Sequence, residues 1–130
     1  MTTEQAYIPG MCNINTAEVA YRRKAMWFGI GFSVALLIGL LALNAPWWVR
    51  ILVLFVPVYI GAIGYLQVKN RFCVSYGTKG QQNANEDSDD PSNVGAENAS
   101  VDKKKARTMG IQALGITVAV LTAVSLIPTL

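Results

Sequence analysis

The sequence predicts an all-α integral membrane protein: three transmembrane helices, N-terminus inside the cell, C-terminus outside, and a mobile cytoplasmic loop between helices two and three. Two observations predict this fold class. Hydrophobic residues make up 52% of the chain and charged residues only 15%, whereas soluble domains carry roughly 25% charged residues. The basic residues also gather on one side of the apolar stretches, which predicts the orientation.

Three apolar stretches predict the spanning helices. Residues 25–45 and 109–130 contain no charged side chain, and residues 47–68 contain only Arg50. Each stretch is long enough to cross a hydrocarbon core of about 30 Å at a rise of about 1.5 Å per residue. Buried helices of soluble proteins seldom run so far without a polar face, so a membrane location is favoured.

The chain divides into four segments on this basis. Residues 1–24 form a cytoplasmic N-terminal arm that runs into the start of helix one. Residues 25–68 form a transmembrane helical hairpin. Residues 69–108 form a cytoplasmic loop with an acidic linker, and residues 109–130 form the third transmembrane helix.

The linker is predicted from composition. Residues 77–100 are rich in Gly, Asn, Ser and acidic residues, with one valine and no aromatic side chain. Such a stretch buries too little apolar surface to offset the entropy of ordering it. We therefore expect a solvated, mobile segment, with the third helix capped by Ser100.

The distribution of Lys and Arg predicts the orientation. Of eleven such residues, three precede helix one and seven lie between helices two and three, which leaves only Arg50 in the short turn. Positive charge marks the cytoplasmic side. We expect a multi-pass protein of the cell (inner or plasma) membrane, with the lipid bilayer as one partner and no nucleic-acid partner.

Side chains near the short turn suggest anchors at the outer interface. Trp47 and Trp48 suit the headgroup level, and Arg50 is expected to snorkel outward past them. Farther along helix two, Pro57 lacks a backbone donor and frees the carbonyl of Val53, so a kink is expected there.

Small residues at four-residue spacing predict close helix contacts. Gly29 and Ser33 lie on helix one, and Gly115, Ala119 and Ala123 form a stripe on helix three. Such residues let backbones approach closely where lipid supplies no hydrophobic drive. Two interpretations remain open: the residues pack the three helices together, or they receive a partner or a second copy.

The two cysteines occupy two short segments on the cytoplasmic side, Cys12 in "PGMCNIN" and Cys73 in "KNRFCVSYG". Both lie close to the same membrane face, so the segments can meet. A disulfide is disfavoured in a reducing cytosol. A metal or iron–sulfur site normally needs four ligands and hence a dimer. The third interpretation is that the thiols only pack beside aromatic neighbours, and no cofactor is expected.

Function is predicted from what the helices lack. The chain has no histidine and no Walker, zincin or Ser-His-Asp pattern, so no enzymatic activity is expected. Transporters bind their ions through polar groups near the midplane, and no charged residue lies in the middle of these spans. We expect a non-catalytic accessory or scaffold subunit of a larger membrane complex or homo-oligomer. Alternatives are a cytoplasmic-face thiol site using Cys12 and Cys73, or a small oligomeric transporter or channel.

Four short elements support a resemblance that covers most of the chain. They are Cys12-Asn13-Ile14, Arg22-Arg23-Lys24, Phe72-Cys73 with Gly77 and Gly80, and the basic run from Lys103 to Arg107. In these elements the chain resembles small three-helix bacterial membrane proteins that have no assigned activity. The resemblance implies a bacterial inner-membrane protein, and the acidic linker looks like an insertion relative to that pattern.

Overall fold

The structure, a computed structural model, describes residues 7–84 and 90–128 and is mostly helical. Its three long helices are α1 (Thr16–Ala42), α2 (Trp47–Asn70) and α4 (Ala96–Ser125). Each is long and apolar enough to cross a membrane. The mostly helical fold and the three long apolar helices that the sequence predicts are therefore confirmed, whereas membrane insertion and orientation stay predictions.

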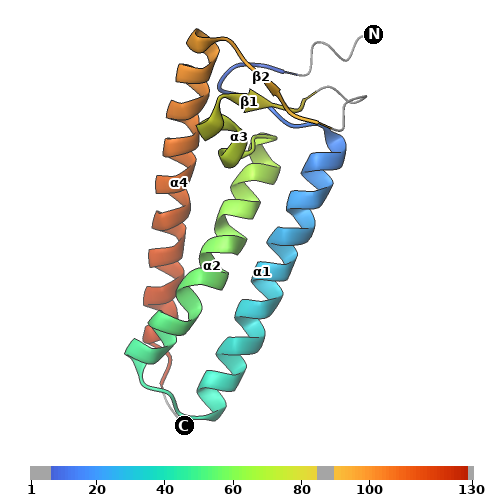
Figure 1. Cartoon of the computed structure of the whole chain (residues 1–130). Helices are drawn as coiled ribbons and strands as arrows, with labels where there is room; N and C mark the ends of the chain where they lie inside the picture. The colour runs from blue at the N-terminus through green and yellow to red at the C-terminus, as the bar shows by residue number, and fades with distance from the viewer. Residues whose placement is uncertain (1–6, 85–89, 129–130) are drawn as a thin grey trace.

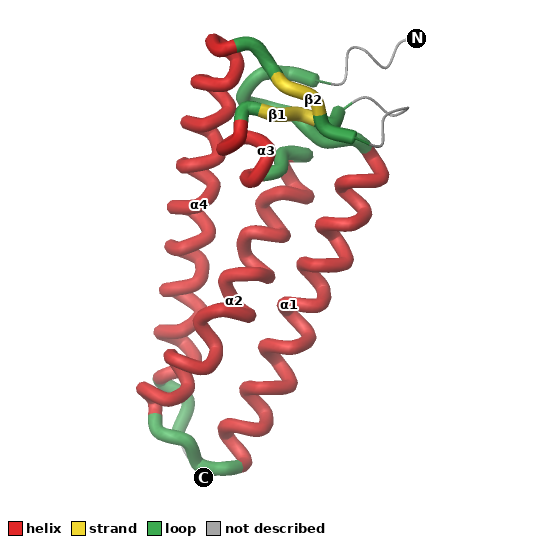
Figure 2. The backbone as a smooth tube through the Cα atoms, in the orientation of Figure 1, coloured by secondary structure: helices red, strands yellow, loops and turns green. Residues whose placement is uncertain are grey.

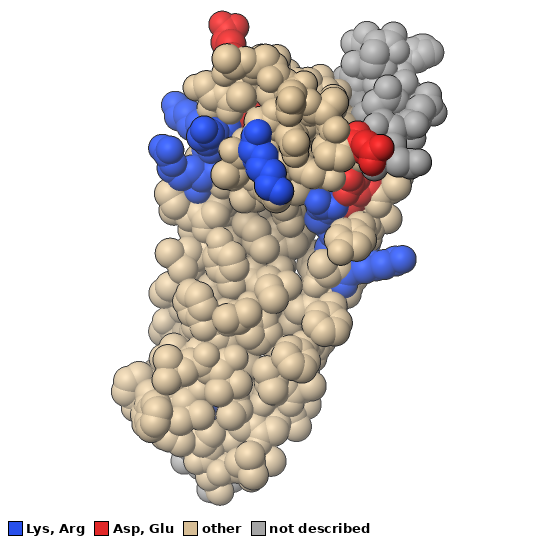
Figure 3. Space-filling view, viewed as in Figure 1, with Lys and Arg blue, Asp and Glu red and all other residues tan. Residues whose placement is uncertain are grey.

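The three long helices lie side by side, with α2 between α1 and α4 (Figure 1). Both outer helices pack on α2 rather than mainly on each other. Charged side chains gather at the end where α1 and α4 begin, and on the visible face the body below that end is almost free of charge (Figure 3). This body of three helices is the part that suits a hydrocarbon environment.

Short elements cover the charged end (Figure 2). They are α3 (Val74–Lys79) and a two-stranded antiparallel sheet of β1 (Gln81–Gln82) and β2 (Ser92–Asn93). The N-terminal segment 7–15 lies against them through a parallel bridge between Ile14 and Asn83. We call the described residues among 7–15 and 71–95, together with the side chains of Glu18, Arg22 and Asp102 that bind them, the polar cap.

The structure differs from the predicted solvated linker in both of the linker's described parts, residues 77–84 and 90–100. Asn83 and Ala84 are only 3% and 0% exposed, and α4 begins at Ala96 with Gly95 as its N-cap residue rather than Ser100. The physical reason is that the N-terminal segment supplies the partners: Asn83 exchanges backbone hydrogen bonds with Asn13 and Asn15 at 2.7 and 2.8 Å. Most of the acidic run 86–90 lies outside the described residues.

The ends of the helices lead the chain into the cap. Asn15 caps α1, with its Oδ1 accepting from the Glu18 N–H at 2.9 Å. Arg71 ends α2 in the left-handed region with φ 50°. The helix α2 continues across Pro57.

Two apolar clusters hold α4 against α2. The first lies next to the polar cap and the second at the opposite end of the body. Their buried members are Ala62, Leu66, Phe72, Ala106, Met109 and Ala113 in the first, and Leu54, Leu121 and Val124 in the second.

Candidate functional site

The side chain of Asn13 joins the two cysteine-containing segments. Its Oδ1 accepts from the Cys73 N–H at 2.6 Å, and its Nδ2 donates to the Cys73 carbonyl at 3.2 Å. Asn13 is 0% exposed and Cys73 1%, so both partners satisfy groups that water cannot reach. The structure thus brings together the two segments that the sequence suggested could meet.

A second network surrounds the Glu18 carboxylate at the start of α1. Its Oε2 accepts from the Tyr76 hydroxyl at 2.7 Å and from Asn83 Nδ2 at 2.8 Å, and its Oε1 pairs with Arg22. Arg22 also donates from Nη2 to the Cys73 Sγ at 3.0 Å. Burial raises the pKa of Tyr76 to about 12, and the hydrogen bond to Glu18 acts in the same direction.

A third contact ties the N-terminal segment to α4 through Asp102, which is 0% exposed. Its Oδ2 accepts from the Tyr7 hydroxyl at 2.7 Å and its Oδ1 from the Gly10 N–H at 2.6 Å. Gly10 has φ 71°, and an added Cβ would lie 2.8 Å from the side chain of Val101, so this turn requires glycine. Burial raises the pKa of Tyr7 above its usual range, and the Asp102 carboxylate adds to that rise.

Both cysteines are free thiols within the polar cap. Cys12 is half-buried, and its Sγ lies 3.7 Å from the Ile14 carbonyl oxygen. Cys73 is buried with Ile14 and Val19. Over residues 7–84 and 90–128, no three His, Cys, Asp or Glu side chains are grouped so that they could hold a metal ion.

Glycines bring α1 and α2 into close contact in the body. A Cβ added at Gly29 would lie 2.7 Å from the backbone nitrogen of Gly61, and one added at Gly64 would lie 3.0 Å from Met26. Ser33 donates from its hydroxyl to the Gly29 carbonyl at 2.6 Å. The structure places Gly29 at this crossing against Gly61 of α2, whereas a packing role for Ser33 stays a prediction.

The predicted stripe on the third helix points away from the other helices. Gly115, Ala119 and Ala123 are exposed, and a Cβ added at Gly115 would meet nothing within 4 Å. Instead, α4 packs on α2 through larger residues such as Met109 and Leu121. The interpretation that this stripe packs the three helices together is therefore wrong for α4. Contact of the stripe with a partner or a second copy stays a prediction.

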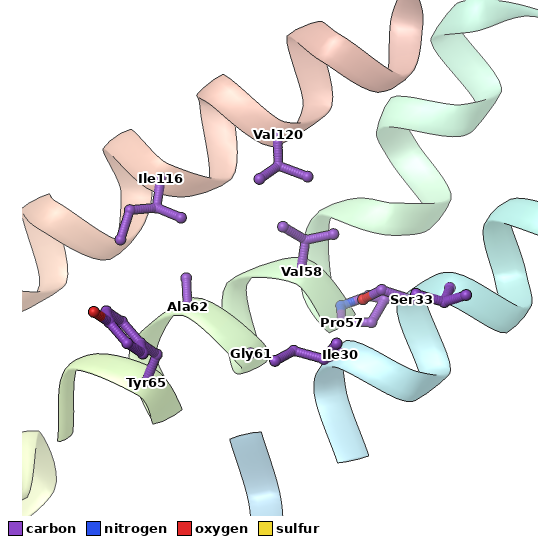
Figure 4. Close-up of a pocket in the computed structure, with 10 residues that line it drawn as sticks. Ile30, Ser33, Pro57, Val58, Gly61, Ala62, Tyr65, Ile116 and Val120 are labelled. Atoms are coloured by element: carbon purple, nitrogen blue, oxygen red, sulfur yellow. The ribbon is translucent and has the colours of Figure 1, made fainter. Parts of the chain in front are cut away.

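An apolar groove of about 400 Å³ runs along α2 between the two outer helices. Figure 4 shows the side chains of Ile116 and Val120 on α4 facing Val58 and Ala62 on α2, with α1 forming the opposite wall. The sequence gives little sign of this groove, because it depends on how the helices are spaced. Its lining consists of Ile30, Ser33, Val34, Pro57, Val58, Gly61, Ala62, Tyr65, Ile116 and Val120.

Arg50 lies at the end of the body opposite the cap, and its side chain is only 1% exposed. Its guanidinium donates to the carbonyls of Ala45, Val124 and Ile127 at 3.1, 3.0 and 2.7 Å. Arg50 therefore does not snorkel outward as expected. Its guanidinium instead binds carbonyls at and just beyond the end of α4, where the helix itself supplies no donors. Trp47 and Trp48 are 60% and 53% exposed, and their position at a membrane interface stays a prediction.

Sequence reasoning missed the roles of several cap residues: Asn13, Glu18, Asn83 and Asp102. A single polar residue beside a cysteine or in a helix start gives no signal for a contact with residues that lie 58 to 95 positions away in the chain. A weak signal was the Pro9-Gly10 turn followed by two asparagines, Asn13 and Asn15, because these residue types favour ordered turns over a free tail.

Comparisons of the chain with protein-family models, with curated proteins and with solved structures find no match. The resemblance to small three-helix bacterial membrane proteins therefore stays an expectation from short motifs. Function has to be inferred from the arrangement of the residues themselves.

Proposed function

We propose that this chain is a non-catalytic integral membrane protein that serves as an accessory or scaffold subunit, packed against a larger membrane complex or against copies of itself. The observation that carries the proposal is the outward stripe of Gly115, Ala119 and Ala123 on α4. Because α4 packs on α2 through a different face, the stripe stays exposed and is free to meet another chain. Small residues on a lipid-facing surface suit the close approach of another helix.

The polar cap supports this proposal from the other end of the molecule. Its buried and half-buried side chains bind one another: Asn13 binds Cys73, Glu18 binds Tyr76, and Asp102 binds the N-terminal segment. Such a network fixes a rigid end on the helices. A rigid end and an outward small-residue stripe are features of a protein that positions other chains.

The proposal is tested by the size of the assembly in mild detergent. Gly115→Leu places a bulky side chain on the stripe, and Gly39→Leu is the matched control, because Gly39 on α1 also has open space around it. We expect wild type and the Gly39 variant to migrate as one assembly larger than a single chain. The Gly115 variant should migrate as a single chain, and a wild type that is already a single chain without a partner would contradict the proposal.

A second candidate, a thiol site at the cap, is favoured by the 3.0 Å contact between Arg22 Nη2 and the Cys73 Sγ, which places a guanidinium beside the thiol. The test compares Cys12→Ala, Cys73→Ala and the double variant. Thiols that only pack give additive losses of about 1–2 kcal/mol each in the free energy of unfolding. Thiols that act together lose the whole of a redox-dependent mobility shift in either single variant.

A further inference from the structure

We propose that the apolar groove between α1, α2 and α4 holds an acyl chain of an anionic phospholipid, with the lipid phosphate at the basic residues beside the polar cap. The proposal rests on the membrane location that the proposed function assumes. It goes beyond that function because it assigns a ligand to a face of the body other than the Gly115 stripe.

The lining of the groove is suited to a hydrocarbon chain. Among the lining residues only Ser33 and Tyr65 carry a polar side-chain atom, and the Ser33 hydroxyl already donates to the Gly29 carbonyl. The floor is made of the small residues Gly61 and Ala62. An apolar ligand can therefore displace solvent or other lipid from this wall while the Ser33 hydroxyl keeps its hydrogen bond.

The length of the groove suits part of an acyl chain. The lining of α2 runs from Pro57 to Tyr65, which is about 12 Å at about 1.5 Å per residue. A methylene chain keeps its carbons about 4 Å from the carbons that it contacts. It can therefore lie along α2 and touch the walls formed by α1 and α4.

Positive charge lies beyond one end of the groove. The Lys69 Nζ is 6.0 Å from the centroid of the Tyr65 ring, and Tyr65 is the lining residue of α2 closest to the cap. On α1, Arg23 precedes the lining residue Ile30 by seven positions, which places both on one helix face. Lys105 of α4 reaches the end of α2, with its Nζ 3.4 Å from Asn70 Oδ1.

The other end of the groove offers no such charge among the described residues. Its nearest cation is Arg50, and that guanidinium is buried against three backbone carbonyls. A lipid therefore has one favourable direction, with its acyl chain along α2 and its phosphate near Lys69. This direction also agrees with the charged end seen in Figure 3.

The test uses native mass spectrometry of the full chain in mild detergent, with phosphatidylglycerol and phosphatidylcholine of matched acyl chains at equal concentration. We expect one phosphatidylglycerol to be retained per chain in preference to phosphatidylcholine. Val120→Trp fills the groove and should lower lipid occupancy at least tenfold. Val118→Trp is the matched control, because Val118 is an exposed valine of the same helix outside the groove, and it should retain the lipid.

The headgroup is tested separately with Lys69→Gln, which should lower the preference for phosphatidylglycerol about fivefold, as expected for one basic side chain near an anionic surface. Lys79→Gln, an exposed lysine of α3, should leave that preference unchanged. Ile30→Trp plugs the groove from the opposite wall and should repeat the Val120 result if Val120→Trp fails to fold.

Three results would overturn the lipid site. The first is equal retention of both lipids, and the second is equal lipid occupancy in the Val120 and Val118 variants. The third is a dimer that Val120→Trp dissociates while no lipid is retained. That result would make a second copy of the chain the occupant of the groove. The scaffold proposal is measured with Gly115→Leu on a different face of α4. Failure of one proposal is therefore distinguishable from failure of the other.

Discussion

In the polar cap, segments far apart in the chain are joined by hydrogen bonds between buried polar groups; in the helical body, neighbouring helices touch through glycines and apolar side chains. Asn13 satisfies the backbone of Cys73 in the cap, whereas Gly29 admits the backbone of Gly61 in the body. One region depends on the presence of particular polar atoms. The other depends on the absence of side-chain atoms.

This difference determines how each region fails. A buried donor or acceptor that loses its partner costs the full desolvation of that group. A side chain added at a close helix crossing forces the backbones apart. Deletions should therefore damage the cap, and additions should damage the body.

The largest effect is expected for Asn13→Ala in the cap. The change leaves both the N–H and the carbonyl of Cys73 without the Asn13 side chain, which should lower the free energy of unfolding by about 2–6 kcal/mol. Hydrogen exchange measured by mass spectrometry should show faster exchange in both cysteine-containing segments. Asn93→Ala at an exposed position of β2 is the control and should change neither quantity.

A smaller effect is expected for Gly29→Ala in the body. The added Cβ would lie 2.7 Å from a backbone nitrogen of α2, so α1 must move, at a cost of about 1–3 kcal/mol. Gly31→Ala on the same helix meets nothing within 4 Å and should be neutral or stabilising by up to about 1 kcal/mol. Unfolding in mixed micelles followed by circular dichroism measures both, and equal losses would show that the crossing is not close.

The body could be predicted from the sequence, and the cap largely could not. Hydropathy and length identify a spanning helix from local residues alone, so 25–45, 47–68 and 109–130 fall within or close to the three helices. The order of residues 81–84 depends on backbone partners at Asn13 and Asn15, and composition carries no information about such partners. The groove and the burial of Arg50 depend on helix spacing in the same way.

The smallest effect is expected for Tyr76→Phe, and it depends on pH. Because the pKa of Tyr76 is raised to about 12 from a usual value of about 10, its contribution to stability is fully present below pH 10. That contribution is lost as pH rises through 12. The variant should lose about 1–2 kcal/mol near neutral pH and should show a weaker fall in stability between pH 10 and 12.

Tyr21→Phe, at an exposed tyrosine near the same end of α1, is the control for that comparison. It should follow the wild-type curve over the whole pH range. If the Tyr76 and Tyr21 variants gave the same alkaline profile, the Tyr76 contact with Glu18 would not contribute to the stability of the cap.

The most direct test of a three-span body with the polar cap inside the cell is a pair of terminal fusions. A fluorescent protein that folds only in the cytoplasm is fused before Met1, and an alkaline phosphatase that is active only outside is fused after Leu130. We expect fluorescence from the first fusion and phosphatase activity from the second. Activity that places both termini on the same side would contradict three spans, and the reversed pattern would place the cap outside the cell.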